Sequence, residues 1–423
     1  MKTTAVIVGT GSIGLTLAAN IMAAEKAQPS DVKVVMVGRN KSVNKLQEQR
    51  FIYAETGPGE VGSSDNIFTK TPVASLFDSP PGSLSVMANL PKLDAAPTTF
   101  VFHAGIHAQI AQILDHENAL KILDAANAIH VVFQNTLDAA DEVRRRVKAN
   151  SRILQVVVNA TANRQVGMDE GRKINVIYCK KTDTSALKII DAPDDLKDQL
   201  NNWFDRKHNP QSATQVIFGD KNMKYDKVAL NATINPLVVI FGLDNTAELL
   251  TECKKDVRFL KLMLGICEEI YHVGVAAKAY SRAKSDEDLI AAIVDVTQNP
   301  FTAIEKYPHH PTSTKVSFDQ NEPTEVDGIN GAISRLGGSL NVSTPLNRLV
   351  TKNFTAIEST RRTYKDIAIF KQTPDVQALL RERQEQLLSA AEIHFSVSDS
   401  AVKKIIFEQF KALAEQYRTG TRG

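Results

Sequence analysis

The chain has 423 residues, of which 43% are hydrophobic and 23% charged, a composition typical of globular proteins. At about 100–200 residues per domain, this length predicts two or three domains. The formal net charge of +2 excludes the strongly basic surface of most nucleic-acid-binding proteins, and no apolar run reaches the roughly 18 residues of a membrane-spanning helix. We therefore expect neither nucleic acid nor a membrane as a partner.

The N-terminus leads directly into the short apolar run 5–8, which is too short for a secretory signal. The three cysteines, Cys179, Cys253 and Cys267, show no CxxC spacing. Such a sparse and odd number favours buried, reduced thiols over disulfides or a zinc site. We expect a cytoplasmic protein with no bound metal.

The first half of the chain alternates short β-branched runs with helical patterns, which indicates a parallel sheet covered by helices. A helix is predicted from Ile13 to about Lys26. The segment 51–98 is rich in Gly, Pro, Ser and Asp, and we interpret it as an insertion with one irregular hairpin. The predicted strands are 4–8, 33–37, 99–103, 129–133, 153–159 and 174–178.

A short strand-like run at 215–218 is followed by helical patterns almost to the end of the chain. The helical periods cover 223–241, 245–280, 285–297, 324–338, 344–359 and 374–417, with breaks expected at Pro300, at the loop from Pro308 to Pro311 and at Pro323. These patterns predict an α/β Rossmann-type domain over 1–215 and an all-α domain over 216–423, with a helical extension from about 360. The apolar spacing of the extension favours packing on its own domain and leaves a homodimer contact open.

A GxGxxG motif follows the first predicted strand and opens the first helix. In this position Gly9 makes the tight turn, Gly11 lets the backbone approach a pyrophosphate, and Gly14 allows close packing of helix and strand. The helix N-terminus offers N–H groups and a partial positive charge to the anion. We predict a dinucleotide-binding turn, which Thr10, Ser12 and Ile13 complete.

The second strand ends at Gly38-Arg39-Asn40-Lys41. A carboxylate there would accept hydrogen bonds from a ribose hydroxyl, whereas an arginine suits a 2′-phosphate. The sequence therefore favours NADPH over NADH. The alternative is that Arg39 and Lys41 are ordinary solvated charges on a turn.

A polar stripe lies within an apolar helical pattern at Lys227, Asn231 and Asn235. Positions four apart lie on one helix face, within about 80° over two steps. Buried amides and ammonium groups need partners, and a substrate with a carbonyl, a carboxylate and a hydroxyl would supply them. Pro236 would free the carbonyl of Ala232 and kink the helix. Pairing of the same face with the other domain remains an alternative.

The motifs of this chain, and their order along it, resemble those of the ketopantoate reductases. These enzymes reduce 2-dehydropantoate with NADPH in pantothenate biosynthesis. The resemblance rests on the glycine turn, Arg39, Phe133-Gln134-Asn135, the stripe ending at Pro236, Asn245, and the segment 324–331, Thr-Glu-Val-Asp-Gly-Ile-Asn-Gly. It implies a Rossmann domain joined to a helical domain of the 6-phosphogluconate-dehydrogenase type, with NADPH and the oxo acid meeting between them.

The resemblance also implies roles for individual residues. Lys227 matches the catalytic proton donor to the ketone. Asn231, Asn235 and Asn245 match substrate-binding positions; Asn135 matches a contact with both substrate and nicotinamide, and Glu325 matches a contact with the cofactor. Ser313 corresponds, with gaps, to a substrate-binding serine, and His103 stands where the family has a cofactor-binding lysine.

These departures, with the insertion and the C-terminal extension, indicate that the substrate is not fixed as ketopantoate. The function we predict is NADPH-dependent reduction of a small 2-oxo acid, with 2-dehydropantoate or a related acid favoured. Two alternatives stay open: a non-enzymatic NADP(H)-binding sensor or scaffold, and a reductase of a different oxo acid or an imine.

Overall fold

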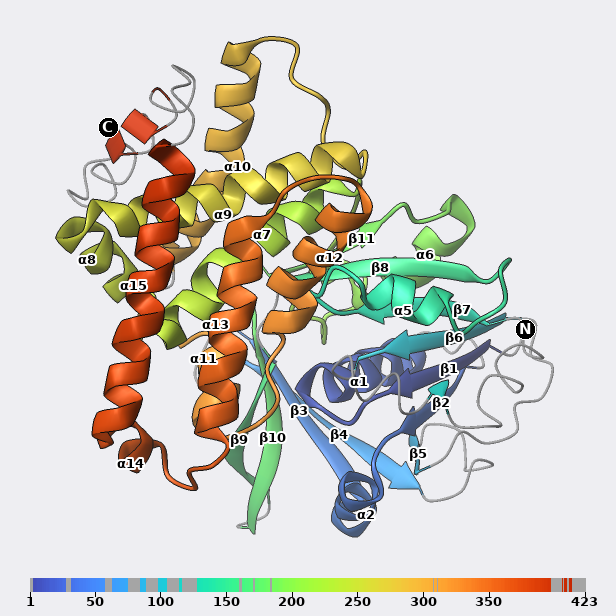
Figure 1. Cartoon of the computed structure of the whole chain (residues 1–423). Helices are drawn as coiled ribbons and strands as arrows, with labels where there is room; N and C mark the ends of the chain where they lie inside the picture. Colours follow the sequence, from blue (N-terminus) through green and yellow to red (C-terminus); the bar gives the residue numbers. More distant parts are fainter. Residues whose placement is uncertain are drawn as a thin grey trace. The chain divides into compact units, whose positions relative to one another are not determined.

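The computed structural model of the chain contains two compact units, residues 1–220 and 221–423. They are described separately below (Figure 1). The structure describes residues 3–27, 32–57, 63–74, 84–88, 98–104, 114–115, 128–159, 162–169, 172–182, 185–306, 308–309, 311–396, 405, 407–408 and 411–412.

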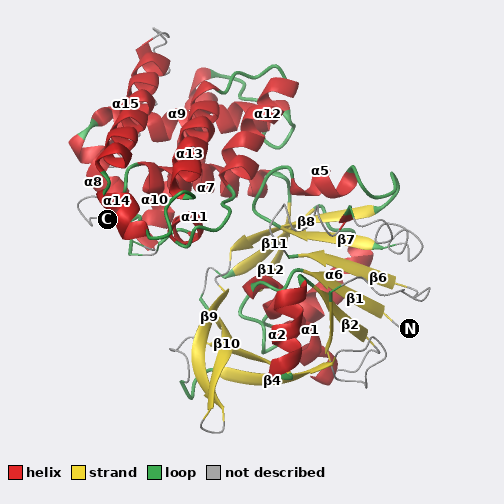
Figure 2. Cartoon of the chain, turned by 60° about the horizontal axis from the view of Figure 1, so that its bottom comes forward, coloured by secondary structure: helices red, strands yellow, loops and turns green. Residues whose placement is uncertain are grey.

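The first unit contains a mixed sheet with the strand order β12-β11-β8-β7-β6-β1-β2-β5-β4-β3-β10-β9 (Figure 2). The strands are β1 (Thr3–Val8), β2 (Val32–Val37), β3 (Phe51–Gly57), β4 (Ile67–Ala74), β5 (Leu84–Met87), β6 (Thr98–His103), β7 (Ile129–Phe133), β8 (Arg152–Asn159), β9 (Ala162–Asp169), β10 (Arg172–Lys180), β11 (Ala186–Ile190) and β12 (Gln215–Gly219). Its helices are α1 (Ser12–Ala27), α2 (Asn40–Gln49), α5 (Ala139–Arg144) and α6 (Asp194–Phe204). The α/β fold class and all six predicted strands are confirmed.

The central strands run parallel, from β8 through β7, β6, β1 and β2 to β5. The chain fills the sheet outward from β1 in one direction through β2, and in the other through β6, β7 and β8. The order therefore reverses between β1 and β6. In open α/β sheets, ligands bind at such a reversal, beyond the carboxyl ends of the strands.

Successive side chains of each strand point to opposite faces of the sheet, and both faces are buried against apolar residues. Ala5 and Ile7 of β1 pack into a cluster that contains Trp203 and Phe204 of α6. Val6 and Val8, on the opposite face, belong to a second cluster. This cluster also contains three residues of α5: Ala139, Ala140 and Val143. Burial on both faces explains why these strands are near-continuous apolar runs.

The segment predicted as an insertion with one hairpin supplies three strands. β3 and β4 form the expected antiparallel hairpin, but β5 pairs with both β2 and β4 in parallel and so joins the hairpin to the main sheet. β10 extends this layer next to β3, and β9 pairs with β10. Because α1 contacts β3, β4, β9 and β10 as well as β1 and β2, the sheet curls around this helix (Figure 2). β12, which lies across the domain boundary suggested by the sequence, pairs with β11 and belongs to the first unit.

The second unit is helical, as predicted. Its elements are α7 (Asn222–Ile240), α8 (Ala247–Lys255), α9 (Val257–Ala276), α10 (Asp286–Lys306), α11 (Ser313–Asp319), the π-helix η1 (Asp327–Gly331), α12 (Ala332–Ser339), α13 (Pro345–Arg361), α14 (Ile367–Gln372) and α15 (Pro374–Ser396). α7, α9, α10 and α13 pack on one another.

Two predicted helix boundaries in this unit are wrong. The break expected at Pro300 does not occur, because α10 continues through it. Packing of α10 on α7 and α9 offsets the hydrogen bond that proline cannot donate. The single helical stretch predicted over 245–280 is divided at Asp256, which has an extended backbone and accepts a hydrogen bond from the Arg258 amide as the N-cap of α9.

The C-terminal extension packs on the helical unit, since α15 lies along α9. Ion pairs join the two helices, Arg258 to Glu385 at 2.6 Å and Lys261 to Glu392 at 2.8 Å. A hydrogen bond of 2.9 Å also links His394 Nε2 and Glu268 Oε2. Apolar residues of α15, Leu387 and Ala391 among them, are fully buried. The core-packing interpretation of the extension is therefore confirmed over residues 374–396, while most of the predicted helix after 396 (397–404, 406, 409–410 and 413–417) lies outside the described residues.

Within the part of the chain that the structure describes, no helix is long and apolar enough to cross a lipid bilayer. The same residues contain no group of three or more His, Cys, Asp or Glu side chains arranged to hold a metal ion.

Two histidines are buried inside the parallel sheet. His103 ends β6 and His130 lies on β7; both are at most 1% exposed. Their rings stack with centroids 5.3 Å apart, and His103 Nε2 lies 3.0 Å from His130 Nδ1. Burial holds the pKa of His103 well below its ordinary value of 6.5, and His130 lowers it further by charge repulsion.

This depressed pKa makes the stability of the first unit dependent on pH. Above the ordinary pKa of 6.5, both the folded and the unfolded states hold a neutral ring. As the pH falls below it, only the unfolded state takes up the proton, so stability is lost toward the lower pKa of the folded state. We predict that the urea midpoint falls between about pH 7.5 and about pH 5.5, and that His103→Gln reduces this fall. The exposed His208→Gln is the control. An equally steep fall in His103→Gln would contradict the prediction.

Candidate functional site

The glycine turn has the geometry of a dinucleotide cradle. Gly9 adopts a φ of 118°, which favours glycine, and its amide donates to the Val37 carbonyl at 2.8 Å. A Cβ on Gly14 would lie 2.1 Å from the Gly9 carbonyl oxygen, so only glycine lets α1 start this close to β1. A Cβ on Gly11 would meet nothing within 4 Å, so the backbone there faces open space. The turn thus leaves room for an anion at the N-terminus of α1, whose first turn carries no acidic residue.

The carboxyl ends of several parallel strands meet beside this turn. The Ala104 amide, after β6, donates to Val8 at 2.8 Å, and the Gly38 amide, after β2, donates to Met87 at 3.1 Å. Asn135 follows β7, is partly buried, and accepts a hydrogen bond on Oδ1 from the Val158 amide at 3.3 Å. Asn135 therefore lies at the same sheet edge as the glycine turn. The side chain of His103, by contrast, lies inside the sheet against His130.

A cavity of about 380 Å³ opens between the glycine turn, α2 and β3. Its polar part carries three cations and no carboxylate, while β3 and β10 supply aromatic and aliphatic residues. The lining residues are Thr10, Leu15, Arg39, Lys41, Ser42, Lys45, Leu46, Gln49, Phe51, Ile52, Tyr53 and Ile177.

Arg39 is exposed and precedes α2 with an extended backbone. The sequence reasoning did not identify Ser42 and Lys45 as lining residues. A signal was present, because Lys41 and Lys45 are four residues apart and so share one face of α2. This concentration of positive charge suits a phosphate group.

In the helical unit, the predicted stripe lies on α7. Lys227 is partly buried, whereas Asn231 and Asn235 are 7% and 6% exposed. Their spacing of four residues places the three side chains along one face of the helix, and α7 runs continuously through Pro236.

Glu325 lies in the segment just before η1 and is partly buried. Burial raises the pKa of its carboxyl, and the positive charge of Lys227 opposes this rise. The charge of Lys227 therefore acts on the Glu325 carboxyl, although the two residues are far apart in sequence. Two oppositely charged groups here lie in the same unit as two buried amides.

Two other predicted substrate contacts have different surroundings. The amide of Asn245 is engaged locally, since Oδ1 accepts from the Ala247 amide at 3.1 Å and Nδ2 donates to Glu248 at 2.9 Å, at the start of α8. Ser313 is exposed and is the first residue of α11, where the preceding Thr312 serves as the N-cap. α11 packs on α7.

Known structures share this fold at low sequence identity. A PanE/ApbA family ketopantoate reductase from Ralstonia eutropha JMP134 superposes with a TM-score of 0.60 and 17% identity, over 86% of this chain and 100% of that one. A D-mandelate dehydrogenase solved with NADH and anilino(oxo)acetate gives 0.58 and 17%, over 85% and 99%. The 2-dehydropantoate 2-reductase from Methylococcus capsulatus gives 0.58 and 16%, over 86% and 99%.

No curated protein matches the chain by sequence. Two family models do. The model of ketopantoate reductase PanE/ApbA matches residues 5–168, and that of the ketopantoate reductase PanE/ApbA C terminal matches residues 221–358. The chain therefore belongs to the ketopantoate reductase (PanE/ApbA) family.

Proposed function

We propose that this protein reduces a small 2-oxo acid to the 2-hydroxy acid with NADPH, and that its substrate is 2-dehydropantoate or a related acid. The observation that carries the proposal is the grouping of Lys227 and Glu325 with the buried amides of α7 in one unit. This set matches the needs of a ketone with a neighbouring carboxylate. It occurs in a chain whose other unit has a dinucleotide turn.

Lys227 donates a proton to the ketone oxygen in this proposal, and its positive charge stabilises the alkoxide as it develops. The Glu325 carboxylate favours the charged form of Lys227, so that Lys227 carries the proton that it donates. Asn231 and Asn235 orient the substrate through their amides, with Asn245 and Ser313 as further candidate contacts. The reduced nicotinamide, when bound, supplies the hydride for the carbonyl carbon.

The glycine turn and the cationic cavity fit NADPH. Gly9, Gly11 and Gly14, with Thr10, Ser12 and Ile13, would hold the pyrophosphate at the start of α1. Arg39, Lys41 and Lys45 would bind the 2′-phosphate, because they line one cavity that contains no carboxylate. Asn135 would contact the nicotinamide from the end of β7. We place the reaction in the cytoplasm, where the free cysteines of the chain would stay reduced.

Replacing the proposed proton donor tests the reaction itself. In Lys227→Ala, kcat should fall by about 10²- to 10⁴-fold because the ketone oxygen loses its acid, while NADPH affinity stays within about twofold. Loss of NADPH absorbance with 2-dehydropantoate and aryl or alkyl 2-oxo acids is the measurement. Lys221→Ala, an exposed lysine at the start of the same helix, should leave kcat unchanged. Full turnover by Lys227→Ala would remove Lys227 from its role, and NADPH binding without turnover of any acid by the natural chain would favour a sensor.

The cofactor preference has a separate test. Arg39→Ala should raise KM for NADPH by about 10- to 100-fold, because a charge-assisted hydrogen bond to phosphate contributes roughly 1.5–3 kcal/mol. KM for NADH should be unchanged. Arg50→Ala removes an exposed arginine at the other end of α2 that does not line the cavity. Equal losses with both cofactors in Arg39→Ala would argue against a 2′-phosphate contact.

The electrostatic contact between Glu325 and Lys227 predicts a change in the pH profile. Without the carboxylate, the Lys227 ammonium gives up its proton more easily. The alkaline limb of kcat in Glu325→Gln should therefore move to lower pH, as measured with saturating NADPH. An alkaline limb at the same pH as in the natural chain would contradict this coupling.

A further inference from the structure

Pro236 creates a hydrogen-bonding problem in the middle of α7. In an α-helix the amide of residue i donates to the carbonyl of residue i−4, so the missing N–H of Pro236 leaves the Ala232 carbonyl without its helical donor. Ala232 is 0% exposed. A buried carbonyl in this position needs a donor from elsewhere in the fold.

The donor is the side chain of Asn330. Its Nδ2 lies 3.0 Å from the Ala232 carbonyl oxygen, and the same nitrogen lies 3.0 Å from Asn347 Oδ1. Asn330 is itself 0% exposed. Both protons of its amide group are therefore directed at acceptors, and a carbonyl acceptor fixes the orientation of the amide.

Asn347 is in turn held by a buried carboxylate. Its Nδ2 donates to Glu269 Oε2 at 2.8 Å, and its backbone amide donates to the same oxygen at 2.9 Å. Glu269 Oε1 accepts from the Leu346 amide at 2.7 Å. This carboxylate lies at the N-terminus of α13, where unpaired amides and the helix dipole favour a negative charge. Asn330 thus bonds to α7 on one side and to an anchored α13 on the other.

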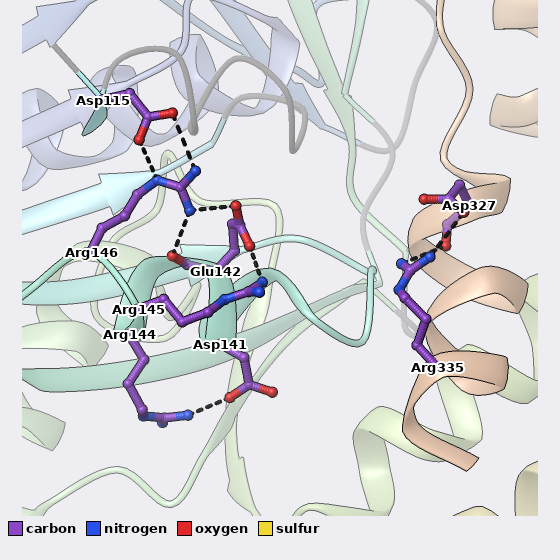
Figure 3. Close-up of polar contacts among 8 residues, drawn as sticks. All are labelled: Asp115, Asp141, Glu142, Arg144, Arg145, Arg146, Asp327 and Arg335. Carbon is purple, nitrogen blue, oxygen red and sulfur yellow. Dashed lines mark hydrogen bonds and ion pairs between the residues drawn. The ribbon is translucent and has the colours of Figure 1, made fainter. Parts of the chain in front are cut away.

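Asn330 belongs to η1, the π-helix that follows Glu325 by two residues. A second contact holds η1 at its first residue: Arg335 of α12 donates to Asp327 Oδ1 at 3.0 Å and to the Asp327 carbonyl at 3.1 Å (Figure 3). Before Glu325, the Thr324 amide donates to Glu358 of α13 at 3.2 Å. The segment that carries Glu325 is therefore fixed at both ends.

The contact at Asp327 differs in strength from the Asn330 bond. The Asp327–Arg335 pair is exposed, with side chains 71% and 53% accessible, so it contributes little. The Asn330 amide is fully buried, and removing it leaves two acceptors without a donor. Asn330 therefore provides a buried bond between η1, which begins two residues after Glu325, and α7, the helix that carries Lys227.

We propose that Asn330 is a positioning residue for the reductase reaction. By donating to the carbonyl that Pro236 leaves free, it fixes η1 against α7, and it thereby holds Glu325 close to Lys227. Three of the five residues involved, Pro236, Lys227 and the acceptor Ala232, lie on α7, so one helix carries both the catalytic ammonium and the attachment point for its carboxylate. This inference rests on the proposed function.

Asn330→Ala tests the proposal. We expect kcat on the accepted 2-oxo acid to fall by about 10- to 100-fold, the loss expected for a small displacement of reacting groups. The alkaline limb of kcat should move to lower pH, as in Glu325→Gln, because the carboxylate withdraws from Lys227. Asn353→Ala is the matched control, since Asn353 is also 0% exposed and its Nδ2 donates to a carbonyl, that of Arg383, at 3.2 Å. It should lower the denaturation midpoint and leave kcat and its pH profile unchanged.

A second pair of variants separates positioning from stability. Pro236→Ala restores an N–H that can reach the Ala232 carbonyl, so Asn330→Ala should lower the denaturation midpoint less in the Pro236→Ala background than in the natural chain. The relative loss of kcat should remain, because the bond between η1 and α7 is still missing. If kcat of the double variant equals that of Pro236→Ala alone, or if Asn330→Ala has full kcat and an unchanged pH profile, the proposal is overturned.

The outcome remains distinguishable if the natural chain turns over no 2-oxo acid. That result would contradict the proposed function. The hydrogen bond from Asn330 to the Ala232 carbonyl would then be tested by hydrogen exchange. Faster exchange of the amides over 324–331 in Asn330→Ala, but not in Asn353→Ala, would support the positioning of this segment by Asn330. Unchanged exchange would contradict it.

Discussion

The positive charge of a lysine acts on a glutamate carboxyl in the helical unit, in surroundings that penalise an isolated charge. Burial alone would drive Glu325 toward its neutral form, and the charge of Lys227 opposes that change. Three helices of this unit, α7, η1 and α13, share a buried network of amides and a carboxylate. This network explains how a helix with an internal proline stays continuous and still presents a polar face.

In the proposed reaction, the first unit has a different task, the binding of a polyanion. It does so with backbone rather than with many side chains: a glycine turn that tolerates no Cβ at Gly14, followed by an unobstructed helix N-terminus. Three cations, Arg39, Lys41 and Lys45, line the cavity beside this turn. In the proposed reaction, the first unit therefore selects the cofactor and the second supplies the proton.

Much of this organisation was readable from the sequence. The glycine spacing, the buried strands and the Lys227 stripe depend on local periodicity, and they were predicted correctly as elements. Features that depend on distant contacts were not. Nothing local shows that β5 joins the hairpin of the insertion to β2, that packing carries α10 through Pro300, or that Asp256 ends one helix and caps the next. His103 was placed at the end of a strand, at the position of a cofactor-binding lysine in the family, but its environment is set by His130 on the neighbouring strand. The freed carbonyl of Ala232 was predicted, whereas its donor, Asn330, lies nearly a hundred residues away.

In the proposed reaction, Lys227 gives its proton to the ketone of a 2-oxo acid. A crystal structure of the chain with NADP⁺ and an unreactive analogue of the accepted acid would decide whether it does. We expect the Lys227 Nζ atom within about 3 Å of the oxygen that replaces the ketone, with the C2 atom facing the nicotinamide. An analogue bound with its C2 oxygen on another donor, and Lys227 turned away from it, would exclude Lys227 as the proton donor.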